Sequence, residues 1–293
     1  MYSVFDASEM FYKVKKSVQE LAPLLVKYKI KGINPPAELL ENPKAAREAA
    51  KCVSDNGLKW GLLPTPADLF APDVTDDMFD IALEKLKIWA DTGQKMGVKY
   101  SYNHIFPGHN ERDYWQNFSW HIIRLQKINK IMADNGIHYG LEFIAPWDLR
   151  VLFKYPFTTT ISGVLAIADA VDPGIGVLFD TYHWFTSGGN PDDLSFAAQH
   201  VDRIVCFHIN DGVEGLSYKE QKDMTRALPM TTGVIDSVTP YKMFLEKGYK
   251  GPVIIEPMFP IYETFKNSEA EEVVKTIADS YNNIKRLAEE KRI

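Results

Sequence analysis

The stretch IHYGLEFIAPWDLRVLFKYPFTTTISGVLAIADAVDPGIGVLFD, residues 137–180, contains a strand pattern, a helical pattern and a second strand pattern. The first strand closes on Glu142 and the second on Asp180. Two later runs end in the same way, RIVCFHIND with His208 and PVIIEP with Glu256. A single buried acid at a strand end is costly and says little. Four such ends, at steps of 38, 28 and 48 residues, predict one site at one edge of a sheet.

Eight short apolar runs, rich in β-branched and aromatic residues, alternate with helical patterns along the chain. The expected strands are YSVF (2–5), IKGIN (30–34), LKWGLL (58–63), VKYSYNH (98–104), IHYGLEF (137–143), GVLFD (176–180), RIVCFH (203–208) and PVIIEP (252–257). The clearest helical patterns cover residues 14–28, 78–97, 118–136, 160–171 and 269–292.

This alternation predicts an α/β fold, a (β/α)8 TIM barrel that forms a single domain over residues 1–293. An open doubly wound sheet is the alternative, but FDASEM (5–10) lacks the G-x-G-x-x-G turn expected after its first strand. The longest irregular region, residues 211–238, is long enough to indicate a lid or a binding loop.

The bulk composition indicates a soluble cytoplasmic protein. Hydrophobic residues make up 45% of the chain and charged residues 25%, as in globular proteins. The net charge of −6 argues against nucleic acid as a partner. The first residues do not read as a signal peptide, and no apolar run approaches the ~20 residues that cross a membrane. Two cysteines give no disulfide framework.

The four strand-end residues supply three carboxylates and one imidazole. That donor set suits a hard divalent cation such as Mn²⁺, Mg²⁺ or Co²⁺, whereas a structural zinc site favours sulfur and histidine. Cys206 stands two residues before His208. Strand alternation therefore predicts that Cys206 points into the barrel interior and packs in the core.

Five segments carry a family resemblance: LEF (141–143), FDTYHWFTSGGNPDDL (179–194), FHINDGVEG (207–215), DMTRALPMTTGVID (223–236) and VIIEPM (253–258). Together they resemble the xylose-isomerase-like barrel superfamily, specifically its sugar phosphate isomerase/epimerase family. That family includes inosose isomerases and dehydratases, ketose 3-epimerases and hydroxypyruvate isomerase. The resemblance covers the last four strands well and the first four weakly. One departure is PMTTG (229–233), where the family commonly has a second glycine.

The resemblance implies one divalent metal ion, Mn²⁺ first with Mg²⁺, Co²⁺ or Zn²⁺ as alternatives, held by Glu142, Asp180, His208 and Glu256. It also implies that Glu142 and Glu256 face each other across the substrate as an acid/base pair. His183 would contact substrate hydroxyls or polarise a carbonyl, and Arg226 would reach the substrate from the long loop.

The expected reaction is removal of a proton from the carbon next to a sugar or cyclitol carbonyl. The metal ion would stabilise the resulting enediolate, and return of the proton would complete an isomerisation or epimerisation. A lyase is the rival interpretation: an inosose dehydratase, or a C-glycoside deglycosidase that cleaves a 3-oxo-glycoside by β-elimination. His104 ends its strand as the ligands do, and an extra base or hydrogen-bond donor there suits elimination.

Aromatic residues near the strand ends suit stacking on a sugar ring or an aromatic aglycone; they are Trp60, Tyr102, Phe106, Trp115, Trp147 and Trp184. Phe106, Trp147 and Trp184 are the predicted substrate contacts among them. His109 is predicted to be a solvated loop histidine. We expect a small-molecule sugar, cyclitol or glycoside as ligand, and a homo-oligomer or an assembly with a partner subunit.

Two further function classes remain as alternatives. Histidine-rich NHIFPGH (103–109) is similar to segments of abasic-site endonucleases in the same superfamily. Those enzymes need more downstream ligands than HINDGVEGLSYKEQKDM (208–224) offers. The last alternative is a non-catalytic sugar-binding barrel.

Overall fold

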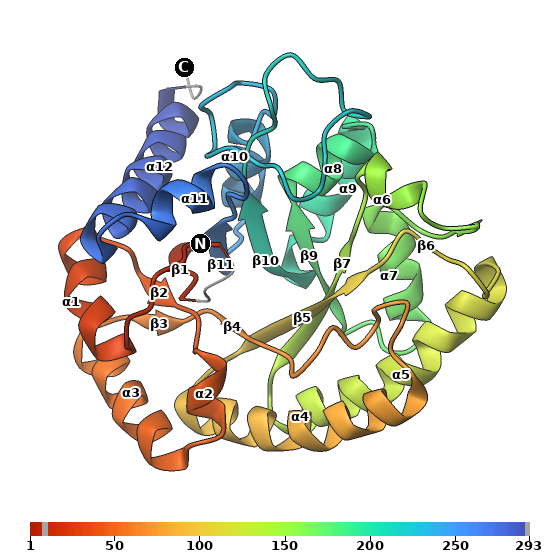
Figure 1. Cartoon of the computed structure of the whole chain (residues 1–293), viewed down its shortest axis with the longest axis horizontal. Helices are drawn as coiled ribbons and strands as arrows, with labels where there is room; N and C mark the ends of the chain where they lie inside the picture. The colour runs from red at the N-terminus through yellow and green to blue at the C-terminus, as the bar shows by residue number, and fades with distance from the viewer. Residues whose placement is uncertain (8–10, 291–293) are drawn as a thin grey trace.

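In the computed structural model, which describes residues 1–7 and 11–290, a nearly closed barrel of nine parallel strands is surrounded by helices (Figure 1). Neighbouring strands follow the order β3-β2-β1-β11-β10-β9-β7-β5-β4. Their bounds are β1 (Tyr2–Phe5), β2 (Gly32–Ile33), β3 (Lys59–Trp60), β4 (Leu62–Leu63), β5 (Tyr100–Ile105), β7 (His138–Phe143), β9 (Gly176–Asp180), β10 (Ile204–Ile209) and β11 (Pro252–Ile255). A separate antiparallel pair consists of β6 (Gly108–His109) and β8 (Tyr155–Pro156).

The predicted TIM barrel is confirmed, and the ninth strand arises because LKWGLL is divided at Gly61. β3 pairs with β2, whereas β4 pairs with β5. The backbone N–H of Leu62 donates to the side-chain oxygen of Asn34 over 2.7 Å. A Cβ on Gly61 would lie 2.1 Å from that same oxygen. Only glycine allows this close approach, so this short segment closes the barrel between β2 and β5.

The helices cover the outside of the barrel (Figure 1). Their bounds are α1 (Val18–Lys27), α2 (Ala37–Leu40), α3 (Pro43–Asp55), α4 (Asp76–Met96), α5 (Tyr114–Asp134), α6 (Trp147–Arg150), α7 (Ile161–Asp169), α8 (Thr181–Ser187), α9 (Pro191–Gln199), α10 (Val238–Glu246), α11 (Ile261–Lys266) and α12 (Ala270–Glu290). The five predicted helical patterns correspond to α1, α4, α5, α7 and α12. Parts of two predictions, the turn at 5–10 and the last helix to 292, lie outside the described residues.

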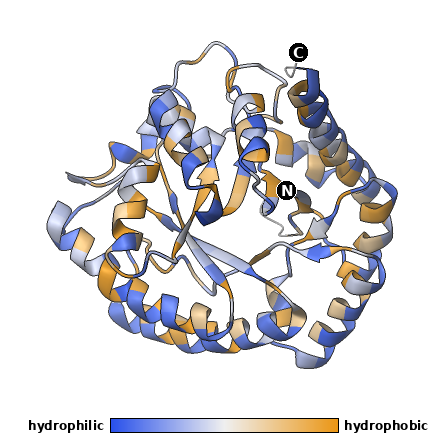
Figure 2. Ribbon diagram, turned by 180° about the vertical axis from the view of Figure 1, so that it is seen from behind, coloured by the Kyte–Doolittle hydropathy of each residue, from blue (hydrophilic) through white to orange (hydrophobic). Residues whose placement is uncertain are grey.

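Local sequence explains where the long helices begin and end. The side chain of Asp113 accepts a hydrogen bond from the N–H of Gln116, whose side chain accepts in return from the N–H of Asp113, and this capping box starts α5. Thr75 caps α4, which ends at Gly97 with a φ of 91°. The apolar sides of the helices face the sheet and the polar sides face outward (Figure 2).

Two apolar layers hold the barrel together. The larger lies between the strands and the helices. The smaller fills the inside of the barrel, and its members include Val4, Leu62, Leu178, Cys206 and Ile254. The predicted core position of Cys206 is therefore confirmed, since its side chain is fully buried. No helix in the described part of the chain combines the length and the apolar composition that a membrane crossing requires.

Candidate active site

Parallel strand register places the candidate side chains side by side at the carboxyl ends of the strands. His104 of β5 is paired with Glu142 of β7. Asp180 of β9 is paired with His208 of β10. Glu256 follows β11, and its backbone N–H donates to the carbonyl of Ile209 over 3.0 Å. Because these ends meet at one rim, the site predicted from four separate segments is assembled there.

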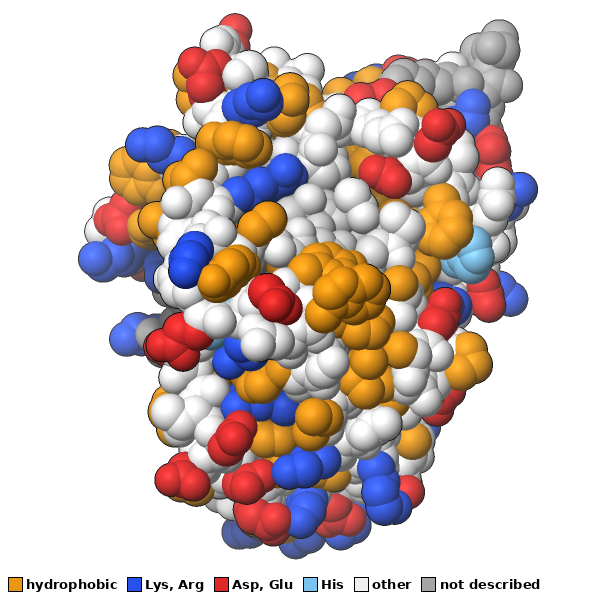
Figure 3. Space-filling view, turned by 90° about the vertical axis from the view of Figure 1, so that its right-hand side faces the viewer, with side chains coloured by type: hydrophobic (Ala, Val, Ile, Leu, Met, Phe, Trp, Pro, Cys, Tyr) orange, Lys and Arg blue, Asp and Glu red, His pale blue; other side chains and the backbone are white. Residues whose placement is uncertain are grey.

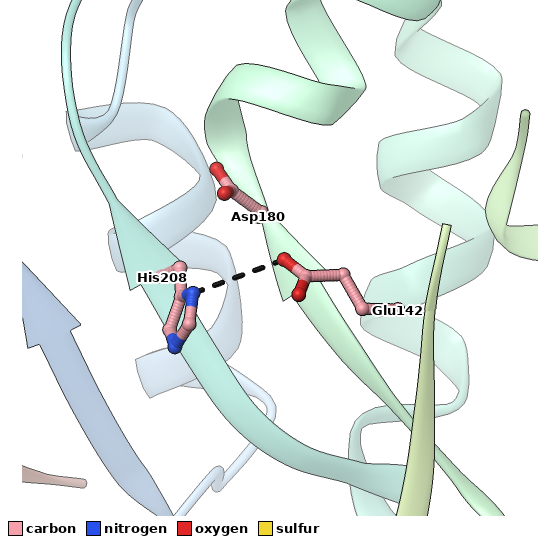
Figure 4. Close-up of side chains that lie close together, drawn as sticks. All are labelled: Glu142, Asp180 and His208. Carbon is pink, nitrogen blue, oxygen red and sulfur yellow. Dashed lines mark ion pairs between the residues drawn. The ribbon is translucent and has the colours of Figure 1, made fainter. Parts of the chain in front are cut away.

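Glu142, Asp180 and His208 form a compact donor group. One potential ligand atom from each lies within 4.8 Å of the others, and all three residues are buried. The three side chains come from adjacent strands; Glu142 and His208 face each other, and Asp180 lies next to them (Figure 4). Nδ1 of His208 is 3.8 Å from Oε1 of Glu142. This spacing is wide enough for a cation between the side chains and too wide for a direct hydrogen bond.

The unsatisfied polar atoms of this group fit a divalent metal ion. Oε1 of Glu142 and both ring nitrogens of His208 are buried and have no hydrogen-bond partner. Leaving such atoms unpaired is costly in a protein interior. A cation that accepts oxygen and imidazole ligands would satisfy Glu142 Oε1 and one His208 nitrogen together.

The fourth predicted ligand, Glu256, lies beside this group, and each of its two carboxylate oxygens faces a different basic side chain. Oε1 of Glu256 is 3.4 Å from Nδ1 of His208. The other oxygen is bound by the guanidinium of Arg226, which also donates to Oδ2 of Asp180 over 2.8 Å. Arg226 is 2% exposed. The predicted substrate-contacting arginine thus bridges two of the predicted ligands.

The charges around the site set its protonation states. Burial raises the pKa of Glu256 to about 7, against the opposing attraction of Arg226. Burial would also raise the pKa of Asp180, but the guanidinium of Arg226 outweighs it and keeps that pKa well below its ordinary value. At His208 the interactions with Glu256 and then Cys206 outweigh burial, and its pKa is raised above the ordinary value. At neutral pH, Glu256 is therefore the carboxyl group best able both to take up and to release a proton.

His104 connects the candidate ligand Glu142 to Asp68, a residue that was not predicted from the sequence. Nε2 of His104 is 3.2 Å from Oε2 of Glu142, and Nδ1 is 2.8 Å from Oδ2 of Asp68. Although burial opposes it, these two carboxylates raise the pKa of His104 well above its ordinary value. Asp68 follows the third strand run in sequence, so an acid just beyond a strand end was the available signal. The result is a hydrogen-bonded chain from Asp68 through His104 to Glu142.

His183 lies in the first turn of α8, directly beyond Asp180. Its Nε2 is 3.9 Å from Glu142 Oε1 and 3.9 Å from Asp180 Oδ2. Burial lowers the pKa of His183. A neutral imidazole at this position can exchange hydrogen bonds with a substrate hydroxyl without adding charge.

A cavity of about 980 Å³ opens over these side chains and is lined by Glu142, His183, His208, Arg226 and Glu256 among others. The predicted contact Phe106 lines it, as do Tyr102, His104 and Asp68. Trp147 and Trp184 are not among the described residues that line it. The indole N–H of Trp184 donates to the carbonyl of Asn190 over 2.9 Å, and Lys219 lies over the ring of Trp147. The structure therefore brings Phe106 to the cavity but not the two tryptophans.

The prediction that His109 is a solvated loop residue was wrong. Its side chain is 5% exposed. Nδ1 accepts hydrogen bonds from the N–H groups of Glu111 and Arg112, and Nε2 is 3.2 Å from the carbonyl of Pro72. The two ring nitrogens of His109 thus form hydrogen bonds with backbone groups that would otherwise need water as a partner, and this allows the residue to be buried.

Comparisons with known proteins agree with the barrel fold. The sequence matches the family model described as Xylose isomerase-like TIM barrel over residues 23–280. A search of curated proteins gave no match. Among solved structures, the chain is similar to the IolI protein with a bound zinc atom, at 19% identity and a TM-score of 0.77, with 97% of this chain and 98% of that chain covered.

Two sugar epimerases share the same fold. D-psicose 3-epimerase from Clostridium cellulolyticum H10, solved with D-tagatose, is 12% identical with a TM-score of 0.74. The 3-keto-D-glucoside 4-epimerase YcjR from E. coli is 14% identical with a TM-score of 0.72. Each comparison covers 98% of this chain and 99% of the other. At these identities the likeness establishes the fold.

Proposed function

Because the chain belongs to the xylose isomerase-like TIM barrel family, we propose that it is a divalent-metal-dependent isomerase or epimerase of a sugar or cyclitol. The reaction is removal and return of a proton on the carbon next to a carbonyl. The observation that carries this proposal is the group of Glu142, Asp180 and His208, in which Glu142 and His208 line the cavity and have buried atoms without hydrogen-bond partners.

The donor set favours Mn²⁺, since its ligands are mostly carboxylate oxygens; zinc is the alternative, because the IolI neighbour holds it. Glu142, Asp180 and His208 would hold the ion, with Glu256 as the fourth ligand. Bound there, it would supply Lewis-acid polarisation of the substrate carbonyl.

The proton transfers belong to the two glutamates. Glu142 and Glu256 each have one carboxylate oxygen within 3.8 Å of Nδ1 of His208. One carboxylate removes the proton and the other returns it to the opposite face, or the same one returns it to the neighbouring carbon. Burial raises the pKa of Glu256 to about 7, and a bound cation would lower it and favour the carboxylate that removes the proton.

Two further residues hold these groups in place. Arg226 fixes Glu256 and Asp180 through its guanidinium. His104 binds Oε2 of Glu142 and so leaves Oε1 directed toward the cluster. These contacts reduce the motion of the reacting groups, which is a large part of the rate enhancement that positioning gives.

β-Elimination by a lyase is the second candidate, and the pair formed by Asp68 and His104 favours it. The pKa of His104 is raised well above its ordinary value by Asp68 and Glu142, which outweigh burial. The imidazole is therefore protonated at neutral pH, and a protonated imidazole can donate to a leaving group. Products decide between the two: an unsaturated sugar or a released aglycone supports the lyase.

The test is proton exchange in D₂O with the Mn²⁺-loaded protein and a panel of keto-sugars and inososes, followed by mass spectrometry. We expect deuterium at the carbon next to the carbonyl. Glu142→Gln and Glu256→Gln should each reduce exchange by about 10²-fold or more, whereas Glu111→Gln, at an exposed loop residue, should not. Full exchange in both glutamine variants would exclude the mechanism and favour a binding barrel.

A further inference from the structure

The candidate carboxylate ligands each have one oxygen held by a donor of the protein itself. In Glu142, Oε2 is paired with Nε2 of His104, whereas Oε1 is buried without a hydrogen-bond partner. In Glu256, Oε2 is bound by the guanidinium of Arg226. A carboxylate held in this way offers a metal ion a single oxygen. Asp180 is held by more donors than either glutamate.

One oxygen of Asp180 has no lone pair left for a metal ion. Its Oδ1 accepts a hydrogen bond from the N–H of Tyr182 over 2.6 Å and another from Nδ2 of Asn210 over 2.9 Å. A carboxylate oxygen has two lone pairs, so these two bonds saturate Oδ1. Oδ2 accepts a hydrogen bond from Arg226 over 2.8 Å, which leaves it one lone pair. Asp180 can therefore offer a cation Oδ2 and not Oδ1.

Oδ2 of Asp180 also lies near the unpaired oxygen of Glu142. Oδ2 of Asp180 and Oε1 of Glu142 are each 3.9 Å from Nε2 of His183. The same Oε1 is 3.8 Å from Nδ1 of His208. The oxygens that remain for a cation thus lie close to two histidine rings, whereas Oδ1 faces Asn210.

A buried network fixes the orientation of the Asn210 side chain. Its Oδ1 accepts a hydrogen bond from the hydroxyl of Thr181 over 3.1 Å, and its backbone N–H donates to the same hydroxyl over 3.3 Å. Ser237 donates to the carbonyl of Asn210 over 2.9 Å. Asp180, Thr181, Asn210 and Ser237 are all fully buried. Because the amide oxygen is taken by Thr181, the amide nitrogen faces Asp180.

A ligand that offers one oxygen discriminates among divalent cations. Ca²⁺ takes about six to eight oxygen ligands and readily accepts both oxygens of one carboxylate. Mn²⁺ accepts imidazole as well as oxygen and favours an octahedral set of ligands. Ligands that use one oxygen each also leave more of the octahedral positions for a substrate. Fixing the carboxylate of Asp180 therefore favours Mn²⁺ over Ca²⁺.

We propose that Asn210 is a positioning residue that makes Asp180 a one-oxygen metal ligand and thereby gives the site its preference for Mn²⁺ over Ca²⁺. This inference rests on the proposed function for the presence of the metal ion. Asn210 is not among the described residues that line the cavity. It acts through the carboxylate of Asp180.

The test measures metal binding in the absence of substrate. Dissociation constants of Mn²⁺ and Ca²⁺ are determined by calorimetry on the metal-free chain. We expect the unmodified protein to bind Mn²⁺ about tenfold more tightly than Ca²⁺, or better. Equal affinities for the two ions in the unmodified protein would overturn the proposal, whatever any variant does.

Asn210→Ala removes one donor from Oδ1, so that the carboxylate of Asp180 can turn and offer both oxygens. The affinity for Mn²⁺ should fall roughly tenfold or more, and the affinity for Ca²⁺ should fall less, so the ratio of the two shrinks. An unchanged ratio in a folded Asn210→Ala variant, with folding checked by thermal unfolding, would overturn the proposal.

Ser237→Ala is the matched control, because it removes a hydrogen bond from the same buried network at a residue whose printed hydrogen bonds go to Asn210 and Thr181. It should lower the Tm of the metal-free protein and keep the ratio of the two affinities. If Ser237→Ala reduces the ratio as much as Asn210→Ala does, the network has only a structural role and the proposal is wrong.

Failure of the proposed function gives a different pattern. If the unmodified protein binds neither ion, both the metal-dependent function and the role of Asn210 are excluded. If Mn²⁺ binds and keto-sugars exchange their protons while Asn210→Ala keeps the ratio, the function stands and the positioning role is excluded. If the ratio depends on Asn210 but no keto-sugar exchanges a proton, the positioning role stands and the reaction is wrong.

Discussion

Glu142 has two carboxylate oxygens in different surroundings. Oε2 is paired with His104, whereas Oε1 is buried without a hydrogen-bond partner. His104 is itself held by Asp68 through its other ring nitrogen. Partners behind a metal ligand orient it and tune its basicity. Asp68 is therefore connected to the candidate ligand Glu142 through His104.

The first prediction concerns Asp68→Asn. Loss of the carboxylate removes a cause of the raised pKa of His104, so the pH at which His104 loses its proton should fall. We expect the proton-exchange rate to drop roughly tenfold and its alkaline limb to move to lower pH. The exposed Asp73 of the same loop offers the control Asp73→Asn. An unchanged pH profile in Asp68→Asn would show that His104 takes no part in exchange.

At the scale of elements, the irregular region between β10 and α10 is built around one carboxylate. Asp211 accepts hydrogen bonds from the N–H groups of Gly212, Thr232, Gly233 and Ile235. Its backbone also pairs with Ala227 in both directions. Within this frame Met230, in the PMTTG segment, has a φ of 60°, a conformation that favours glycine. The departure from the family pattern is thus accommodated with backbone strain.

The second prediction follows from Asp211. Asp211→Ala leaves four buried or partly buried N–H groups without their acceptor, which should cost roughly 2–4 kcal/mol of unfolding free energy. Because this loop carries Arg226, proteolysis within residues 212–236 should accelerate and substrate KM should rise. Glu214→Ala, at an exposed position of the same loop, is the control. Equal proteolysis rates in the two variants would mean that Asp211 does not hold the loop.

The third prediction concerns His121 on α5, whose ring is stacked between Phe70 and Phe157 at 5.1 and 5.0 Å. Burial lowers its pKa to about 3, whereas an unfolded histidine titrates near 6.5. Below about pH 6.5 the unfolded state binds a proton that the folded state does not. The free energy of unfolding therefore decreases as the pH is lowered, by up to about 1.4 kcal/mol per pH unit.

His121→Phe removes this dependence and the unpaired Nε2. We therefore expect the variant to gain stability relative to the unmodified protein as pH falls from 7 to 4.5, measured by urea unfolding. His200→Phe at the end of α9 is the size-matched control and should keep the original slope. Parallel curves for His121→Phe and the unmodified protein would contradict the assignment.

For the whole molecule, the fourth prediction is that Mn²⁺ stabilises the fold. A ligand that binds only the folded state at 100 times its dissociation constant adds about 2.7 kcal/mol. In a chain of 293 residues this corresponds to a rise in Tm of roughly 4–5 °C. The rise should be absent in Glu142→Gln and reversed by a chelator. Identical melting curves with and without Mn²⁺ would exclude a metal site that includes Glu142.

Exposed apolar side chains gather on one face of the molecule (Figure 3). Figure 3 shows apolar side chains gathered on the face that carries α6 and β6 in Figure 1. Exposed apolar residues of these segments and of the start of α5 include Trp115, Trp147, Val151 and Leu152. The homo-oligomer or partner subunit, like the single domain over residues 1–293, stays a prediction.

Local pattern was sufficient for most of the fold. Apolar strand runs and glycines beyond helix ends are short-range signals, and Gly57, Gly97, Gly136 and Gly248 all have positive φ. The division of LKWGLL was not visible in the sequence. It depends on Asn34, which lies 27 positions before Gly61 in the sequence. The side-chain oxygen of Asn34 accepts a hydrogen bond from the N–H of Leu62 and leaves no room for a Cβ on residue 61.

The sequence alone determined that Glu142, Asp180, His208 and Glu256 end strands, because each closes an apolar run. Which atoms of these residues are free to bind a cation was decided only by tertiary structure. Arg226 reaches Asp180 and Glu256 from a distant loop, and Asp68 reaches His104 from the loop after β4. Such contacts depend on how loops cross the rim in three dimensions, and side-chain pKa values depend on that geometry through burial and charge.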